Sequence, residues 1–153
     1  SILIKNGRVI DPDTKLDDQC DILIKGDKIE KVGRDLKEKA DTTIDASGYY
    51  VMPGLIDMHV HLRDPGYTYK ETVESGALAA AKGGFTTVLA MPNTRPVTDD
   101  KTRLRYVMNK AKTNSVIHVL QVGAITKGQE GMELADIEGM IEAGAPAISE
   151  DGK

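Results

Sequence analysis

The stretch that decides the fold class is GLIDMHVHLRDPG, residues 54–66, because two kinds of side chain alternate along it. Every second residue from position 57 is polar or titratable: Asp57, His59, His61 and Arg63. The residues between them are apolar: Ile56, Met58, Val60 and Leu62. Successive side chains of a strand point to opposite faces of its sheet. We therefore expect a strand whose apolar side packs against helices and whose polar side carries chemistry.

Apolar runs rich in β-forming residues follow this strand at regular intervals, at residues 85–91, 115–122 and 145–149. Helical patterns separate them, at residues 70–84, 98–114 and 132–144. The last pattern places four apolar residues on one face: Leu134, Ile137, Met140 and Ile141. A strand roughly every 30 residues matches one βα unit, which predicts an α/β fold with a parallel sheet. Two architectures fit, the first four strands of a (β/α)8 TIM-like barrel and a short open doubly wound sheet.

Residues 1–52 follow a different rhythm, in which short apolar runs are separated by turn residues. Asn6-Gly7 and Gly26-Asp27 each lie between two such runs, a pattern typical of two-residue hairpin turns. Ser47-Gly48 stands inside a third pair of runs. We expect a small antiparallel β unit of sandwich type over residues 1–52, and the first half of a metal-dependent hydrolase barrel over residues 53–153.

The composition is that of a soluble globular protein, with 40% hydrophobic and 29% charged residues among 153. A net charge of −4 and the absence of Trp argue against nucleic acid as a partner, because such surfaces need basic patches and stacking platforms. No run is typical of a signal peptide or a membrane span. The single cysteine, Cys20, indicates a reducing compartment and is expected to be a small packing residue. We expect a cytoplasmic protein with no membrane partner.

His59 and His61 form a pair that can chelate a metal, because residues i and i+2 share one face of a strand. Two half-buried histidines bonded to backbone carbonyls would give the same spacing. Arg63 follows at the end of the strand, before the turn residues Asp64-Pro65-Gly66, and fits either a bidentate carboxylate contact or a solvated surface charge.

Three other positions near predicted strand ends carry polar side chains. Asn93, in the loop after the second strand, fits either a donor to a ligand carboxylate or a turn-forming residue beside Pro92. Glu150 and Asp151 follow the fourth strand. A carboxylate there could be a metal ligand or a base, or it could cap the loop before Gly152.

His118 lies inside an apolar run, and we expect a packed, hydrogen-bonded core histidine there.

Several motifs together resemble one family. PGLIDMHVH at 53–61 resembles the first barrel strand of the amidohydrolase superfamily. LRDPG at 62–66, AMPNTRPVTD at 90–99, GAIT at 123–126 and SEDGK at 149–153 are similar to bacterial type I dihydroorotases. The resemblance covers the whole chain, including the small N-terminal β unit, and the combination of motifs is highly specific.

The resemblance implies a zinc-dependent cyclic amide hydrolase that interconverts N-carbamoyl-L-aspartate and L-dihydroorotate in pyrimidine biosynthesis. It implies that His59, His61 and Asp151 are metal ligands, and that Asp151 bridges if two zinc ions bind. It also implies that Arg63 and Asn93 hold the substrate carboxylate. Many relatives use a carboxylated lysine near the end of the fourth strand, and this chain has no lysine there. The number of zinc ions, one or two, is thereby left open.

The family's proton-shuttling aspartate and its remaining histidine ligands belong to later strands, which this chain does not contain. We therefore expect the 153-residue chain alone to be inactive. Lys153 ends the chain in a strand-to-helix loop that a trypsin-like protease could cut. We therefore hypothesise that this chain is one piece of a proteolytically cut enzyme and that the remainder is a second fragment of the same protein.

Three other interpretations stay open. A hydantoinase or allantoinase would share the zinc histidines but differ where Arg63 and Asn93 meet a carboxylate. A non-catalytic dihydroorotase-like subunit would be expected to have lost metal ligands, and an open-sheet binding domain would not explain the polar face of the first strand. Two protein partners are left open. One is a second copy of the chain, and the other is aspartate transcarbamoylase, which some relatives bind.

Overall fold

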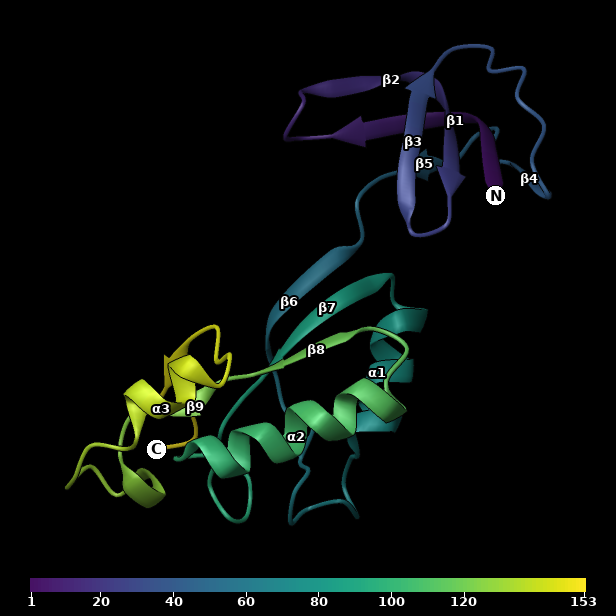
Figure 1. Cartoon of the computed structure of the whole chain (residues 1–153). Coiled ribbons are helices and arrows are strands. Elements are labelled where there is room, and N and C mark those ends of the chain that lie inside the picture. Colours follow the sequence, from purple (N-terminus) through teal and green to yellow (C-terminus); the bar gives the residue numbers. More distant parts are fainter. The chain divides into compact units, whose positions relative to one another are not determined.

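The computed structural model describes residues 1–153 and divides them into two units, Ser1–Pro53 and Gly54–Lys153 (Figure 1). Each unit has its own strands and its own buried residues. None of the helices combines the length and the hydrophobicity that a bilayer crossing requires.

The first unit is a single five-stranded sheet in which β1 pairs with three other strands. The strands are β1 (Ile2–Asp11), β2 (Leu16–Lys25), β3 (Lys28–Gly33), β4 (Thr42–Asp45) and β5 (Tyr50–Val51). The neighbours β1–β2 and β2–β3 are antiparallel, whereas β4 and β5 pair with β1 in parallel. The prediction of a small antiparallel unit is therefore confirmed for β1, β2 and β3, and it is wrong for β4 and β5. After β3 the chain returns to the start of β1, where Thr42 pairs with Ile2, and it then runs in the direction of β1.

The expected turn at Asn6-Gly7 is instead a bulge within one long strand. The register of β1 against β2 shifts between Ile4 and Gly7, and Asn6 has a φ of 62°. The bulge removes the backbone N–H of Asn6 from the pairing with β2, and this N–H donates instead to Oδ1 of Asp21 at 2.8 Å. A distant side chain thus holds Asn6 in the left-handed conformation that the sequence pattern had indicated for a turn.

The other two expected turns differ in outcome. The hairpin at Gly26-Asp27 is confirmed, because Lys25 pairs with Lys28 across it. The residues around Ser47-Gly48 do not form a hairpin, because β4 and β5 both pair with β1 and not with each other. Tyr49 O accepts from Arg8 N, which extends the contact of this segment with β1.

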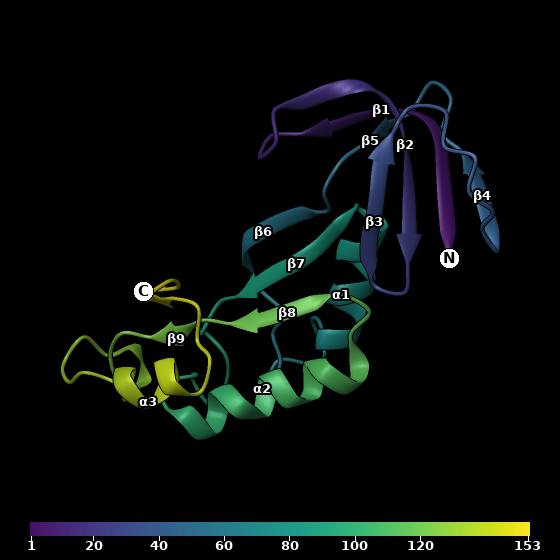
Figure 2. The ribbon, with the colours of Figure 1, turned by 45° about the horizontal axis from the view of Figure 1, so that its top comes forward.

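The second unit alternates strands and helices. Its elements are β6 (Leu55–Val60), α1 (Val73–Lys82), β7 (Phe85–Ala90), α2 (Lys101–Asn114), β8 (His118–Gln121), β9 (Gly123–Ala124), the 3-10 turn η1 (Lys127–Gln129), α3 (Ile137–Glu142) and β10 (Ile148–Ser149). The strands β6, β7 and β8 form a parallel sheet in chain order. After Val122 the chain continues as β9, which pairs in parallel with β10. Figure 2 shows α1 and α2 on the same face of the β6-β7-β8 sheet.

The first two predicted helices are confirmed, although each begins three residues later than its sequence pattern, at Val73 and Lys101. The Thr72 side chain accepts from Ser75 N at the start of α1, and Gly83 ends that helix. Asp100 accepts from Arg103 N at the start of α2. The third helix is much shorter than expected, since α3 begins only after Asp136. Residues 125–136 form a loop with η1 instead, which leaves Leu134 exposed.

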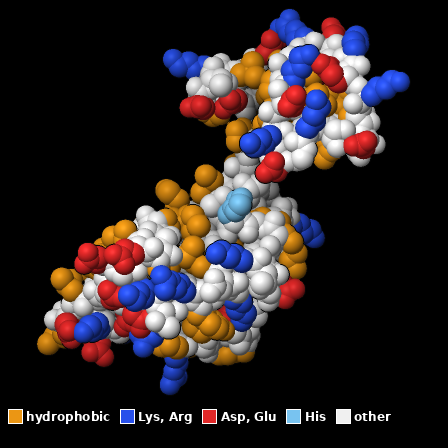
Figure 3. Space-filling view, in the orientation of Figure 1, with side chains coloured by type: hydrophobic (Ala, Val, Ile, Leu, Met, Phe, Trp, Pro, Cys, Tyr) orange, Lys and Arg blue, Asp and Glu red, His pale blue; other side chains and the backbone are white.

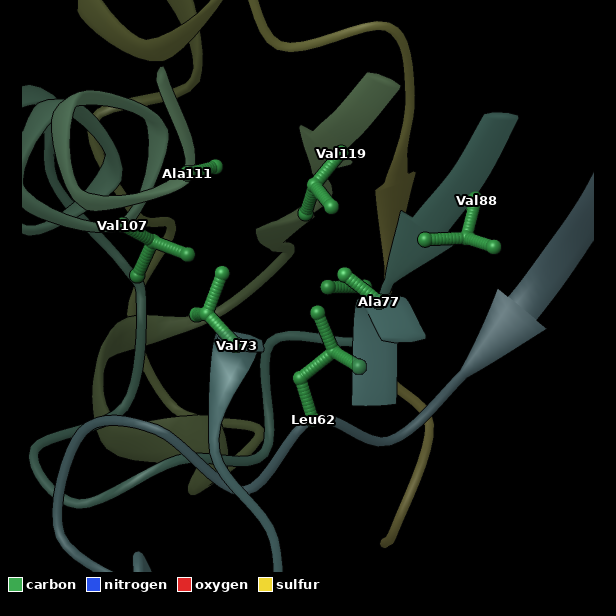
Figure 4. Packing of buried hydrophobic residues seen from close by; sticks show 8 residues of the cluster. Leu62, Val73, Ala77, Val88, Val107, Ala111 and Val119 are labelled. Atoms are coloured by element: carbon green, nitrogen blue, oxygen red, sulfur yellow. The ribbon is translucent and has the colours of Figure 1, made fainter. Parts of the chain in front are cut away.

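The core of the second unit lies between the sheet and helices α1 and α2 (Figure 4). Its buried members are Leu62, Val73, Ala77, Val88, Ala90, Val107, Ala111 and Val119. Burial of a Val or Leu side chain contributes about 1.5–3 kcal/mol, so this cluster fixes the strands against the helices.

The simple alternation predicted along residues 56–63 is broken by a bulge in β6. Asp57 pairs with Val88 and Val60 pairs with Ala90, so three steps along β6 match two steps along β7. Val88 and Ala90 are both buried on the helix side. Ile56 and Met58 are 62% and 72% exposed, and the expectation that both pack under helices is wrong. Leu62 is buried in the core, as expected.

Candidate metal centre

Three predicted ligands meet where the parallel strands end. His59 is the second-last residue of β6, His61 follows that strand directly, and Asp151 follows β10. Nε2 of His59 lies 3.2 Å from Oδ1 of Asp151, and Nε2 of His61 lies 3.4 Å from Oδ2. In Figure 3 histidine side chains reach the surface of this unit beside hydrophobic ones. The structure thus brings together residues that are 90 positions apart in the chain (151 − 61).

This group of side chains fits a divalent metal ion. One donor atom from each of the three residues lies within 4.8 Å of the others. Imidazole nitrogen and carboxylate oxygen are the donor types that zinc takes in catalytic sites, commonly with three protein ligands. The lone pairs of two imidazoles and a carboxylate face one another favourably only with a proton or a cation between them. The chemistry of the donors therefore supports zinc at this position.

Asn93 fixes the orientation of His61. Nδ1 of His61 lies 2.9 Å from Oδ1 of Asn93. A carbonyl oxygen only accepts hydrogen bonds, so Nδ1 carries the hydrogen and Nε2 keeps its lone pair towards Asp151. Gly152, with a φ of 97°, lies against the Asn93 side chain, where a Cβ atom would be 2.7 Å from Nδ2. The loop after β7 and the turn after β10 are therefore in direct contact at this site.

Asp57 and Arg63, predicted in one row with the histidines, have different environments. Oδ1 of Asp57 accepts from His59 N at 3.0 Å, so this carboxylate holds the strand backbone at His59. Arg63 is half-buried and has a φ of 60°, an unfavourable conformation for a residue with a side chain. None of the ion pairs in the chain includes Arg63. Its guanidinium remains available for an anion.

Asp64, the next residue, anchors this loop to α2. Its side chain is 1% exposed, and Nζ of Lys110 lies 2.6 Å from Oδ2. The hydrogen bond to Asp64 raises the pKa of Lys110, although partial burial opposes the shift. The backbone of Arg63 is held on one side by the buried Leu62 and on the other by this ion pair.

Glu150 and His118 do not take part in the group. The Glu150 carboxylate accepts from Ile125 N at 3.0 Å, Thr126 N at 3.2 Å and the Thr126 hydroxyl. The hydrogen bond from the Thr126 hydroxyl, helped by the two backbone N–H groups, lowers the pKa of Glu150. His118 is exposed and makes no hydrogen bond through its side chain, so the prediction of a packed core histidine is wrong. It precedes Val119, which takes the buried position on the helix side.

Gln129 was not expected at this site. Its Nε2 donates to the backbone oxygen of Asp151 at 2.7 Å, from the turn η1. The only local signal is its position between the glycines of GQEG, which is typical of a tight turn and does not indicate a contact with a residue 22 positions away.

Comparison with known proteins gives a consistent result. Residues 48–153 match the family described as dihydro-orotase-like. The chain is 55% identical over 152 residues to the dihydroorotase of Clostridioides difficile (strain 630), which covers 99% of this chain and 36% of that protein. It is 52% identical over 154 residues to the dihydroorotase of Geotalea daltonii, and this match covers 100% of this chain and 36% of that protein. The chain thus spans about a third of the length of these relatives.

Solved structures show the same architecture. The L-hydantoinase (dihydropyrimidinase) of Arthrobacter aurescens superposes with a TM-score of 0.83 at 28% identity, covering 97% of this chain and 32% of that one. The D-hydantoinase of a Thermus species superposes with a TM-score of 0.70 at 35% identity, and the match covers 82% of this chain and 28% of that one. On the match over residues 48–153 and the identity to curated dihydroorotases, the chain belongs to the dihydroorotase-like family.

Proposed function

We propose that this chain supplies part of the active site of a dihydroorotase, which interconverts N-carbamoyl-L-aspartate and L-dihydroorotate. The observation that carries the proposal is the convergence of His59, His61 and Asp151 within 4.8 Å in a chain 55% identical to a dihydroorotase. The chain spans about a third of such relatives, so the activity is proposed for a protein that also contains the later strands.

The strands that carry these residues fit the beginning of a barrel. We place β6, β7, β8 with β9, and β10 as the first four parallel strands of a (β/α)8 barrel. Their parallel pairing in chain order and the likeness to a hydantoinase at a TM-score of 0.83 support this placement. In such barrels the active site lies at the carboxyl ends of the strands, where His61, Asn93 and Asp151 are found.

His59 and His61 would hold zinc through Nε2, and Asp151 through its carboxylate. When bound, zinc would lower the pKa of a water and polarise the amide carbonyl of the ring. The contribution of the chain itself is to hold its donors in place. Asn93 keeps the hydrogen of His61 on Nδ1, and Asp57 holds the backbone at His59.

Arg63 and Asn93 are proposed to bind the carboxylate of the substrate. A guanidinium with no carboxylate partner of its own is suited to bidentate contact with an anion. Oδ1 of Asn93 is used by His61, which leaves the Nδ2 hydrogens for the ligand. A substrate with a carboxylate beside the cyclic amide would satisfy both groups.

A hydantoinase is the second candidate, because two solved structures that superpose well on this chain are hydantoinases. Those structures are 28% and 35% identical to this chain, against 55% for a dihydroorotase, so the dihydroorotase is favoured. Hydantoin and allantoin lack a carboxylate on the ring and would leave Arg63 without a partner.

A chimera tests the proposed activity. This chain replaces the matching part of the Clostridioides difficile dihydroorotase, and the unaltered enzyme serves as the positive control. We expect hydrolysis of L-dihydroorotate, loss of activity in His59→Ala, and a raised KM with a smaller change in kcat in Arg63→Gln. A chimera that folds but prefers hydantoin or allantoin, or that remains active as His59→Ala, would contradict the proposal.

A further inference from the structure

The backbone of Asp151 is held by groups outside the three ligands. Its N–H donates to Oγ of Ser149 at 3.1 Å, and its oxygen accepts from Nε2 of Gln129 at 2.7 Å. The carboxylate of the preceding residue, Glu150, is bound by the N–H groups of Ile125 and Thr126. The segment that carries the ligand is therefore tied on both sides to the loop after β9.

Gln129 is placed for this contact by an unfavourable backbone conformation. It has a φ of 58°, and Gly128 before it has a φ of 59°. Non-glycine residues in this region cost free energy and persist where the surroundings impose them. The side chain of Gln129 is buried, with the residue 4% exposed, and its amide faces a carbonyl oxygen that can only accept.

The turn that carries Gln129 is itself anchored away from the metal centre. Gly128 N donates to Oδ2 of Asp99 at 2.7 Å, just before α2. Asp99 O in turn accepts from Asp136 N at 3.1 Å. Gln129 thus connects the fixed start of α2 to the turn that presents Asp151.

We propose that Gln129 is a positioning residue for the metal ligand Asp151, acting through the peptide of that ligand. The inference rests on the proposed metal centre. Groups that orient a ligand typically change metal affinity about 10- to 100-fold when they are removed. If Gln129 only fills space, its amide can be replaced by an apolar group of equal size without consequence for the metal.

The test measures zinc affinity of the 153-residue chain by competition with a chromophoric chelator, together with thermal unfolding of the metal-free chain. Gln129→Met keeps the length of the side chain and removes the donor, and Gln129→Glu replaces the donor with an acceptor. Glu130→Gln is the matched control, an exposed residue of the same loop. His59→Ala identifies the site at which zinc is measured.

We expect affinity to fall about 10-fold or more in both Gln129 variants, with the control unchanged. The metal-free melting temperature should stay close to that of the unaltered chain in Gln129→Met and should fall in Gln129→Glu, because the new carboxyl group is buried against a carbonyl oxygen. The visible spectrum of bound Co²⁺ should also change in Gln129→Met, because the carboxylate of Asp151 is displaced. Unaltered zinc affinity and an unaltered cobalt spectrum in Gln129→Met would overturn the inference while leaving the metal centre intact. Absence of zinc binding by the unaltered chain would overturn both.

If neither variant folds, the unaltered chain gives the answer through the side-chain amide signals of Gln129 in a ¹H–¹⁵N spectrum. We expect these signals to shift when zinc is added to the unaltered chain and to stay in place when it is added to His59→Ala. Signals that do not respond to zinc in the unaltered chain would overturn the inference.

Discussion

His61 is the residue whose environment best defines the site. One ring nitrogen faces Oδ1 of Asn93 and the other faces Oδ2 of Asp151. Partners on opposite sides of the ring fix both its orientation and its tautomer, which is the usual arrangement of a metal-bound histidine. His59 has the second contact with Asp151, so the carboxylate lies between the two rings.

Asn93 should therefore control zinc affinity through its oxygen. Asn93→Ala is expected to weaken zinc binding of the chain about 10-fold or more, because Nδ1 of His61 loses its acceptor. Asn93→Asp retains an acceptor oxygen and should keep most of the affinity. Asn109→Ala, at an exposed position of α2, is the control. Equal affinity of Asn93→Ala and the unaltered chain, measured by chelator competition, would show that His61 does not depend on Asn93.

At the level of the elements, the loop after β6 depends on α2. The buried Asp64 has one ion-pair partner, Lys110, which is on the third turn of that helix. The contact fixes the loop that contains Arg63, two residues beyond the second histidine. Helix α2 thus contributes to the site although none of its own residues belongs to it.

Lys110→Met should destabilise the second unit, because it leaves the Asp64 carboxylate buried without a charge partner. We expect a loss of about 3 kcal/mol, at the lower end of the range for a broken buried pair because Lys110 is partly exposed. Lys112→Met, at an exposed position of the same helix, should change stability by no more than about 0.5 kcal/mol. Urea unfolding measures both. Similar midpoints for the two variants would show that the ion pair is not stabilising.

The features predictable from the sequence are those that local residues determine. Thr72 and Asp100 indicate the starts of α1 and α2, and the spacing of His59 and His61 indicates a shared direction. The bulges at Asn6 and within β6 could not be predicted, because Asp21 and the pairing with β7 produce them.

The same limit applies to the candidate site. The polar residues at the strand ends were predictable, because the carboxyl ends of parallel strands lie along one edge. The partner of each residue was not. Glu150 and Asp151 are adjacent in the sequence, yet one binds the loop at Thr126 and the other faces the histidines. Only the tertiary structure distinguishes them.

Across the whole molecule, each unit buries an aspartate that is paired with a lysine, Asp21 with Lys5 in the first unit and Asp64 with Lys110 in the second. The first unit contains Asp21, which is 3% exposed and accepts from Asn6 N, Leu36 N and Lys5. Burial alone would raise the pKa of Asp21, but the two backbone N–H groups and Lys5 together lower it. A lowered folded pKa contributes stability above the unfolded pKa, and this contribution is lost as pH falls through the folded value.

The first unit should therefore lose stability on acidification, beginning near the unfolded aspartate pKa of about 3.9 and continuing below it. Asp21→Asn lacks the stabilising contribution of the ionised Asp21 carboxylate, so the variant should be less stable at pH 7. The difference in the free energy of unfolding between the variant and the unaltered chain should shrink in acid. Asp13→Asn, at an exposed position, is the control. Urea unfolding followed by amide signals of β2 measures the effect. A constant difference across this pH range would contradict the account.

We propose that His59, His61 and Asp151 of this chain bind the same metal ion. The most direct measurement is anomalous diffraction at the zinc absorption edge from crystals of the chain grown with zinc. We predict an anomalous peak within bonding distance of Nε2 of both histidines and of a carboxylate oxygen of Asp151. A map with no peak there, or with zinc only at other side chains, would contradict the claim.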